Sequence, residues 1–343
     1  MGSENCQWRL LLCCFCLLTS CGCRDRVARD LVFCPPVPRY IFLEKRQLSE
    51  TETECKVILA VDANTPARRC SCQKQELAYC THTKPLTHQD LQHLGVRTNA
   101  LSEVRGLYTV TKQGNRIGMV YYPHGESKYL VLFAHGNACD LGSCISCIQE
   151  MRNRLGVSVL AFDYSGYGVS EGSPSVSCVR GDIEAALRVA TTTLRHRVED
   201  IVLYGQSLGT GAVCHIAPRV PVAGVILHSP LASGLRVLRS DVKRDYCCDI
   251  FPNHSRVRSV KSPVFVIHGS NDQQISLEHG QQVFDNAAVA YGFWNVRGAG
   301  HNDIEVVAGD EYWRRVRAFL QHVFEGNVND GDDASTSPAR IVM

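Results

Sequence analysis

The stretch Asp200–Gly209 has the sequence DIVLYGQSLG, an apolar run that leads directly into a Gly-x-Ser-x-Gly pentapeptide. The run predicts a buried strand, and the residues after it predict a helix. Ser207 therefore lies on a strand-to-helix turn, where glycines on both sides remove the Cβ atoms that would block a sharp, strained backbone. This context favours a nucleophilic serine facing the free N–H groups of a helix start, over a serine that only caps the helix.

Apolar runs and helical patterns alternate from Gly106 onwards. A hairpin is predicted over residues 107–122, with its turn at Gly114-Asn115. Further strands are predicted at Tyr129–Ala134, Val157–Phe162, Val222–Leu227, Val264–Ile267 and Gly292–Val296, and helices at Leu141–Leu155, Ser177–His196 and Tyr312–Phe324. Apolar strands separated by helices are typical of a mostly parallel sheet covered by helices on both faces. Because Ser229–Ser262 is too short for a large cap domain, we expect an α/β fold without one.

Two residues that could activate Ser207 each follow a predicted strand. Asp272 comes after one strand, and His301 lies in a glycine-rich loop after the last strand. The chain order Ser, Asp, His, with each residue at the carboxyl end of a strand, is typical of a hydrolytic triad on an α/β sheet. The alternatives are a solvated loop histidine and an ordinary turn aspartate. We predict Ser207 as nucleophile, His301 as general base and Asp272 as the acid. Asp303 is a rival acid, but it is too close in sequence to His301 to orient the imidazole ring easily.

A fourth element follows the strand at Tyr129–Ala134, where the sequence is His135-Gly136-Asn137-Ala138. The loop at this place in an α/β sheet supplies a second backbone donor to a developing oxyanion. The predicted oxyanion hole therefore consists of the backbone N–H groups of Leu208 and Asn137. His135 is expected to brace this loop and to take no part in the chemistry.

Composition limits the class of partner. The formal net charge is +2, and no basic patch is interleaved with aromatic residues, so nucleic acid is not an expected partner. Hydrolysis by a Ser-His-Asp triad requires no metal and no organic cofactor, and we expect neither. Of the eighteen cysteines, eleven lie in the first eighty residues. Cysteines are therefore concentrated near the N-terminus, and this part of the chain differs in composition from the rest.

These patterns divide the chain into four parts. Residues 1–40 form a Cys-rich segment closed by a proline run and are expected to anchor the chain to a membrane. Residues 41–105 are polar without clean periodicity and are expected to form an irregular Cys-containing insert. Residues 106–325 form the α/β domain that carries the candidate triad. Residues 326–343 are expected to be disordered.

The apolar run Leu10–Leu18 is shorter than the ~20 residues that span a bilayer. Three interpretations are open: a thioacylated segment on a cytosolic membrane face, a signal-peptide core leading to an oxidising compartment, and a buried helix end. The glycosylation sequon Asn253-His254-Ser255 fits the second interpretation, whereas the density of cysteines favours the first. The expected lipidation sites are Cys13, Cys14, Cys16, Cys21 and Cys23.

Seven segments carry a resemblance to a known family: HGNACDLG, FDYSGYG, LYGQSLGT, LHSPLASGLRV, FPN, PVFVIHGSNDQQI and GAGHNDIE. Between about Gly106 and Phe324, and in this order, the chain resembles the α/β-hydrolase domain-containing 17 family. The resemblance extends weakly to the N-terminus, where those enzymes carry a palmitoylated cysteine cluster before a proline-containing segment. The stretch with Cys55, Cys70, Cys72 and Cys80 has no match in the family pattern.

The resemblance implies an α/β-hydrolase fold and a palmitoyl-protein thioesterase that removes palmitate from S-acylated membrane proteins. It assigns the nucleophile, acid and base to Ser207, Asp272 and His301. Acylated N-terminal cysteines would hold the enzyme on the cytosolic face of the plasma or endosomal membrane; the secretory pathway is the alternative if the N-terminus is a signal peptide. The same triad could serve a lipid or small-ester carboxylesterase, and an inactive membrane-associated binding module is a further alternative.

Overall fold

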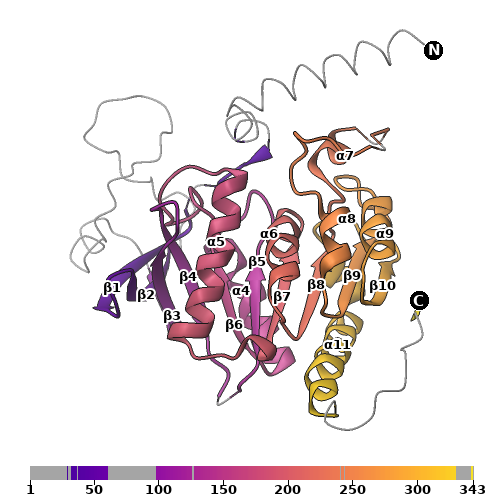
Figure 1. The fold of residues 1–343 in the computed structure, drawn as a ribbon. Coiled ribbons are helices and arrows are strands. Elements are labelled where there is room, and N and C mark those ends of the chain that lie inside the picture. Colours follow the sequence, from indigo (N-terminus) through magenta and orange to yellow (C-terminus); the bar gives the residue numbers. More distant parts are fainter. Residues whose placement is uncertain are drawn as a thin grey trace.

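A computed structural model describes residues 29, 32–36, 38–60, 98–125, 127–239, 241–242, 244–329 and 341–342. The described strands form one eleven-stranded sheet in the order β1-β2-β3-β4-β6-β5-β7-β8-β9-β10-β11 (Figure 1). Their bounds are β1 Tyr40–Gln47, β2 Glu52–Ala60, β3 Thr98–Val110, β4 Arg116–Tyr122, β5 Leu130–Ala134, β6 Ser158–Phe162, β7 Ile201–Gln206, β8 Gly224–His228, β9 Val264–Gly269, β10 Ala290–Val296 and β11 Ile341–Val342. The five expected lipidation cysteines lie outside the described residues.

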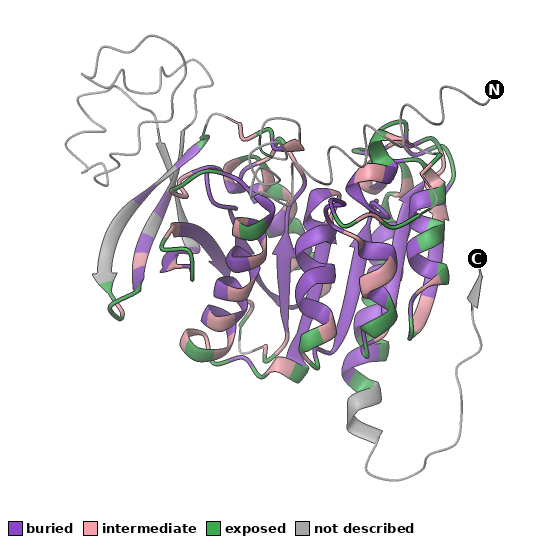
Figure 2. Cartoon of the chain, turned by 45° about the horizontal axis from the view of Figure 1, so that its top comes forward, coloured by how far each residue is buried: buried purple, intermediate pink, exposed green. Residues whose placement is uncertain are grey.

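The sheet is antiparallel from β1 to β4 and where β4 pairs with β6; the pairs from β6 through β5, β7, β8 and β9 to β10 are parallel. The central strands are buried on both faces, as parallel strands between helices must be (Figure 2). In β5, Leu130 and Leu132 belong to the core on one face, whereas Val131 and Phe133 belong to the core on the other.

Helices cover both faces of the sheet. The helices are α4 Leu141–Leu155, α5 Val176–Arg188, α6 Leu208–Ile216, α7 Gly234–Leu238, α8 Asn253–Arg256, α9 Leu277–Asp285, α10 Ile304–Ala308 and α11 Asp310–Asn329. One core contains buried residues of α5, α6 and α9, and the core on the opposite face contains those of α4 and α11. The predicted α/β-hydrolase fold is therefore confirmed, and between β8 and β9 the described residues hold only α7, α8, a 3-10 turn and their connecting loops.

The prediction of an irregular insert at residues 41–105 is wrong where the structure describes that segment. β1 and β2 pair with each other, and β2 pairs with β3, so the domain begins at Tyr40. Phe42 and Val57 are buried, and both approach Gly106 of β3 so closely that a Cβ there would lie 3.1 Å from each side chain. Phe42 lies in the apolar run Tyr40–Leu43, which is followed by charged residues, so β1 shows no clean alternation, and only the pairing with a neighbouring strand reveals it.

The expectation of a disordered tail also needs correction. α11 continues to Asn329, and Ile341 and Val342 pair in parallel with Gly292 and Phe293 of β10. Residues 330–340 lie outside the described part. In contrast, the predicted hairpin is confirmed, since Gly114 adopts φ 83° in the turn between β3 and β4.

We predict that Phe42→Ala lowers the free energy of unfolding by about 3–5 kcal/mol, the usual cost of removing a buried phenyl ring. The ring is 2% exposed and packs edge-to-face on Tyr40 and Tyr108. Denaturant unfolding would measure the loss. Val306→Ala is the control, because Val306 is 83% exposed and its truncation should change stability by about 0.5 kcal/mol at most. A loss below about 1 kcal/mol for Phe42→Ala would mean that β1 does not pack on the domain.

Candidate active site

Ser207 lies on the turn between β7 and α6 with φ 51° and ψ −114°. A non-glycine residue at positive φ costs about 1–3 kcal/mol unless its surroundings enforce it. Here the Ser207 N–H donates to the His228 carbonyl at 2.8 Å, and the Ser207 carbonyl accepts from the N–H and hydroxyl of Thr210 at 3.0 and 2.6 Å. These bonds hold the serine in its strained conformation at the carboxyl end of the strand.

The glycines of the pentapeptide are required by close backbone contacts. A Cβ on Gly209 would lie 2.0 Å from the carbonyl oxygen of Ala134, and a Cβ on Gly205 would lie 2.7 Å from the carbonyl oxygen of Gly209. Neither backbone oxygen can move aside as a flexible side chain could. The Gly-x-Ser-x-Gly pattern thus allows α6 to pack directly against the end of β5.

The structure brings the three predicted residues together. His301, in the loop after β10, places Nε2 2.9 Å from Ser207 Oγ and Nδ1 2.6 Å from Oδ2 of Asp272, which follows β9. A carboxylate only accepts hydrogen bonds, so Nδ1 carries the proton and Nε2 is left to accept from the serine hydroxyl. This orientation is the one that a general base requires.

Asp272 is fixed by its own hydrogen bonds. Oδ1 accepts from the backbone N–H groups of Gln274 and Ile275 at 2.9 and 2.8 Å. His268 Nε2 lies 3.3 Å from Oδ2 and 2.8 Å from the Ile275 carbonyl. Burial alone would raise the pKa of Asp272, but the hydrogen bonds from His268, His301 and the Ile275 N–H outweigh it and hold that pKa well below its usual range.

His268 was missed by sequence reasoning. It is fully buried at the end of β9, four residues before Asp272, and it helps to orient the carboxylate through Oδ2, the oxygen that also accepts from His301. The only signal in the sequence is a histidine at a strand end just before an acid, in VFVIHGSND. Such a histidine is equally compatible with an ordinary core position.

The rival acid Asp303 has a different role. Its Oδ1 accepts from the Gly300 N–H at 2.6 Å, and the side chain is exposed at the start of α10. Asp303 therefore shapes the loop that carries His301, whereas Asp272 contacts the imidazole. This geometry agrees with the predicted ranking of the two acids.

The loop after β5 lies beside the serine. A Cβ on Gly136 would be 3.7 Å from Ser207 Cβ, so Gly136 lies close to the nucleophile. The Asn137 side chain faces the segment before β1: Nδ2 donates to the Val32 carbonyl at 2.6 Å, and Oδ1 accepts from the Cys34 N–H at 3.0 Å. Leu208, the first residue of α6, has a backbone N–H without an intrahelical partner. The assignment of the Leu208 and Asn137 N–H groups to an oxyanion hole stays a prediction.

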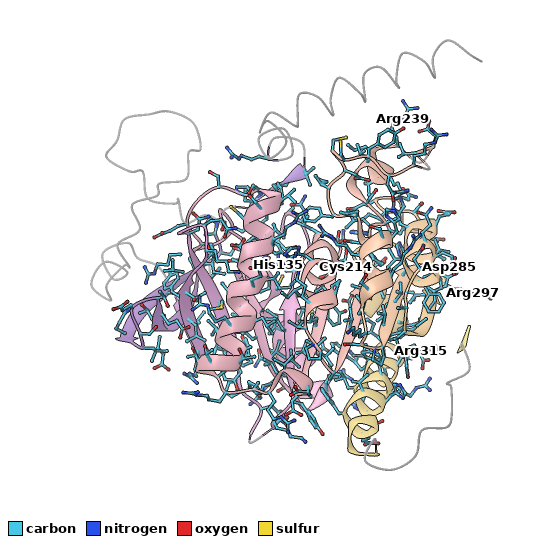
Figure 3. All side chains as sticks on the ribbon, viewed as in Figure 1. His135, Cys214, Arg239, Asp285, Arg297 and Arg315 are labelled. Carbon is cyan, nitrogen blue, oxygen red and sulfur yellow. The ribbon has the colours of Figure 1, made fainter. Side chains whose placement is uncertain are left out.

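His135 braces this loop, as the sequence predicts. The ring is fully buried in the interior of the domain (Figure 3), with Nδ1 2.8 Å from the Gly136 carbonyl and Nε2 3.1 Å from Asp163 Oδ1. Burial opposes the charged imidazole, but the contact with Asp163 outweighs burial and raises the pKa of His135. The Tyr164 hydroxyl also donates to the His135 carbonyl at 2.6 Å.

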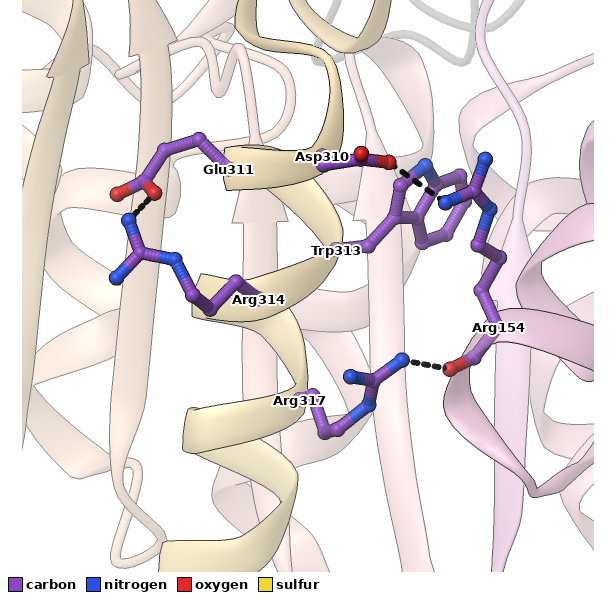
Figure 4. Close-up of a pocket in the computed structure, with 6 residues that line it drawn as sticks. All are labelled: Arg154, Asp310, Glu311, Trp313, Arg314 and Arg317. Carbon is purple, nitrogen blue, oxygen red and sulfur yellow. Dashed lines mark hydrogen bonds and ion pairs between the residues drawn. The ribbon is translucent and has the colours of Figure 1, made fainter.

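A hollow of about 510 Å³ between α4 and α11 does not contain the triad (Figure 4). Its lining residues are Arg154, Asp310, Glu311, Trp313, Arg314 and Arg317. Arg154 pairs with Asp310 at 2.7 Å, and Arg314 pairs with Glu311. With these charges paired and no nucleophile in the lining, the hollow is a surface feature separate from the candidate site.

Among the described residues, no group of three or more His, Cys, Asp or Glu side chains could hold a metal ion. No helix among the same residues is long and apolar enough to cross a membrane.

Comparisons with known proteins agree with this fold. A family model described as serine aminopeptidase, S33 matches residues 125–242. The chain is 36% identical to mouse alpha/beta hydrolase domain-containing protein 17C over 90% of this chain and 93% of that protein, and 33% identical to human protein 17B over 92% and 97%. An esterase from Pyrococcus furiosus matches with TM-score 0.54 and 20% identity over 64% of this chain and 90% of that one, and so supports the fold.

We predict that the stability difference between the wild type and Asp272→Asn depends on pH. The pKa of Asp272 in the folded chain lies below its ordinary value of 3.8, so ionisation stabilises the fold above pH 3.8, and this stabilisation is lost as the pH falls through the folded-state pKa. The difference in unfolding free energy, measured in denaturant, should therefore shrink below pH 3.8.

The control is Asp303→Asn, which should keep the pH dependence of the wild type because the bonds around Asp272 remain. A constant difference between wild type and Asp272→Asn from pH 6 to about pH 3 would contradict the tight hydrogen bonding of this carboxylate.

Proposed function

Because this hydrolase belongs to the alpha/beta hydrolase domain-containing protein 17 family, we propose that it cleaves acyl thioesters and removes palmitate from S-acylated, membrane-associated proteins. The observation that carries the reaction type is the continuous line of hydrogen bonds from Ser207 through His301 to Asp272. An inactive binding module would have no need to keep the serine at a strained positive φ or to fix the acid with four donors. The substrate class is supported by the family and by the cysteine-rich N-terminus.

In the proposed reaction, His301 Nε2 takes the Ser207 proton as Oγ attacks the thioester carbonyl carbon. The resulting oxyanion accepts from the backbone N–H groups of Leu208 and Asn137, each worth about 3–4 kcal/mol in the transition state. Asp272 holds the imidazolium in place and stabilises its charge. His301 then protonates the departing thiolate, and in the second half it activates a water molecule that hydrolyses the acyl-enzyme.

A thioester suits this site for a chemical reason. The leaving thiol has a pKa of about 8.5, so it departs far more readily than an amine. The segment LASGLRVL, a candidate wall for an acyl groove, includes α7, which follows β8 at the carboxyl edge of the sheet (Figure 1). Its Val237 and Leu238 are 39% and 65% exposed. Exposed apolar side chains at the edge of the sheet that also carries Ser207 are compatible with a lipid chain that is still attached to a protein.

The structure also bears on the secretory alternative. Asn253 of the sequon is fully buried, and its amide nitrogen donates to Thr210 Oγ1 at 3.2 Å and to the Leu231 carbonyl at 3.0 Å. A glycan would replace one of the two N–H donors of that nitrogen and would not fit in the core. The sequon therefore gives no support to a signal peptide, and we propose the cytosolic face of a membrane as the location.

We predict that a fluorophosphonate probe labels the protein covalently and that Ser207→Ala abolishes the labelling. Turnover of an acyl thioester should fall by at least about 10⁴-fold, because loss of the nucleophile leaves only binding and oxyanion stabilisation. Ser146→Ala, on the exposed side of α4, is the matched control and should label as the wild type does.

Probe labelling that persists in Ser207→Ala would reject the nucleophile. A panel of thioesters and oxyesters with the same acyl chain then tests the substrate class. A clear preference for oxyesters would favour the carboxylesterase over the thioesterase.

We predict that changing the five expected lipidation cysteines to serine releases the protein from membranes. Each acyl chain contributes about 0.8 kcal/mol per buried CH₂, so their loss removes most of the membrane affinity. Turnover of a membrane-bound acylated protein should fall because enzyme and substrate no longer share a surface, whereas turnover of a soluble short-chain thioester should not change. Fractionation and the two assays measure this.

The matched control changes Cys70, Cys72 and Cys80, which lie in polar sequence, and should leave the protein on membranes. If the five-cysteine variant also stays on membranes, thioacylation at these cysteines is not the anchor. If it loses activity on both substrates, the N-terminal segment instead supports the fold.

A further inference from the structure

His135 and Asp163 form a buried pair at the ends of two adjacent strands. Ala134 of β5 pairs with Phe162 of β6. The residues that follow them are His135 and Asp163, and the register therefore places these two residues side by side at the carboxyl edge of the sheet. Both are fully buried, and His135 Nε2 lies 3.1 Å from Asp163 Oδ1. His135 is also the first residue of the loop that adjoins Ser207.

The contacts of the His135 ring determine its protonation. Nδ1 lies 2.8 Å from the Gly136 carbonyl, and a carbonyl oxygen only accepts, so Nδ1 carries a proton. Nε2 faces the carboxylate of Asp163, whose Oδ1 also accepts from the Leu141 N–H at 3.0 Å and whose Oδ2 accepts from the Tyr40 hydroxyl. Burial raises the pKa of Asp163, and the contacts with His135 and Tyr40 oppose that rise. Because both carboxylate oxygens act as acceptors, Nε2 carries a proton as well, and the ring is an imidazolium.

The bond from Nδ1 sets the direction of the next backbone N–H. The peptide unit between Gly136 and Asn137 is planar and trans, so its C=O and N–H groups point in opposite directions. The carbonyl points to the buried His135 ring, and the Asn137 N–H must therefore point away from that ring. Among the backbone hydrogen bonds of the described loops and turns, none uses the Asn137 N–H. This donor is thus available to an oxyanion.

A second buried ring holds the preceding peptide unit. The Tyr164 hydroxyl donates to the His135 carbonyl at 2.6 Å, and the centroids of the two rings lie 4.5 Å apart. Tyr164 is fully buried. The first two carbonyl groups of the loop are therefore held by buried side chains, and neither peptide unit can rotate without leaving a buried polar group unsatisfied.

We propose that His135 is a positioning residue of the oxyanion hole, because its bond to the Gly136 carbonyl directs the Asn137 N–H towards the oxyanion. Asp163 supplies the opposite charge that keeps the ring in place for this bond. Glycine has the widest choice of backbone conformations, so without the bond the peptide unit after Gly136 can turn its N–H away. Loss of one oxyanion donor lowers kcat by about 100- to 1000-fold, and a donor that is only partly misdirected should cost at least about tenfold. This inference rests on the proposed function.

Two amide substitutions in the full-length protein test the position of the donor. The amide nitrogen of Asn is bonded to Cγ, as Nδ1 is in histidine, whereas the amide nitrogen of Gln lies one bond further out, near the place of Nε2. His135→Asn should therefore keep the bond to Gly136, and kcat for a short-chain acyl thioester should stay within about threefold of the wild type. His135→Gln should lose the bond, and kcat should fall at least about tenfold with KM within about twofold, because the interaction is made only in the transition state.

His196→Gln is the matched control. His196 is also buried, and its Nδ1 lies 2.8 Å from the carbonyl of Lys128, which precedes β5, whereas His135 follows that strand. The control therefore removes the same kind of bond at the opposite end of the strand. It should leave kcat and KM at their wild-type values, whatever it costs in stability.

The ranking of the two amides decides the inference. A kcat for His135→Gln that equals or exceeds that of His135→Asn would overturn it, since filling the space of the ring favours the longer side chain. If the single variants do not fold because Asp163 is left charged without a partner, the same two substitutions are compared in an Asp163→Asn background, where the same ranking is expected. A wild type that cleaves oxyesters but no thioesters would refute the proposed function, and the ranking measured on the oxyester would still decide the role of His135.

Discussion

The backbone of Gly209 lies against the carbonyl of Ala134, and this contact joins the two halves of the candidate site. Because glycine has no Cβ, the first turn of α6 reaches the end of β5, and the loop that follows β5 therefore lies next to Ser207. A side chain at this position would push the nucleophile away from the Gly136 loop. The strained φ of Ser207 follows from the same contact, since the chain must reverse sharply to bring the helix so close.

The register of the parallel strands positions the other loops of the candidate site. Ala134 pairs with Gly205, Gln206 with His228, and Val296 with Gly269, so that the carboxyl ends of neighbouring parallel strands lie level with one another. The loops that follow β5, β7, β9 and β10 therefore meet at one edge. Residues that are far apart in the sequence come within hydrogen-bonding distance because the sheet aligns their strands.

The sequence predicted the central part of this arrangement well, because each buried strand is a continuous apolar run and each triad residue follows one. It failed at β1 and β2, whose burial depends on partners far along the chain, with Phe42 and Val57 packing on Gly106. It also missed His268. That residue acquires its role only through neighbours at particular distances, and no local pattern reports a distance.

Two hydrogen bonds join the Asn137 side chain to the backbone of Val32 and Cys34. They limit the distance between the candidate active site and any earlier residue that is anchored in a membrane. The same hydrogen bonds hold the chain at Val32 against the loop after β5, which adjoins Ser207. Val32 lies nine positions after Cys23, and a fully extended chain spans at most about 3.5 Å per residue, or about 30 Å in total. A lipid on Cys23 would thus confine Ser207 to a shallow layer above the bilayer, and only thioesters close to the membrane surface would lie within its reach.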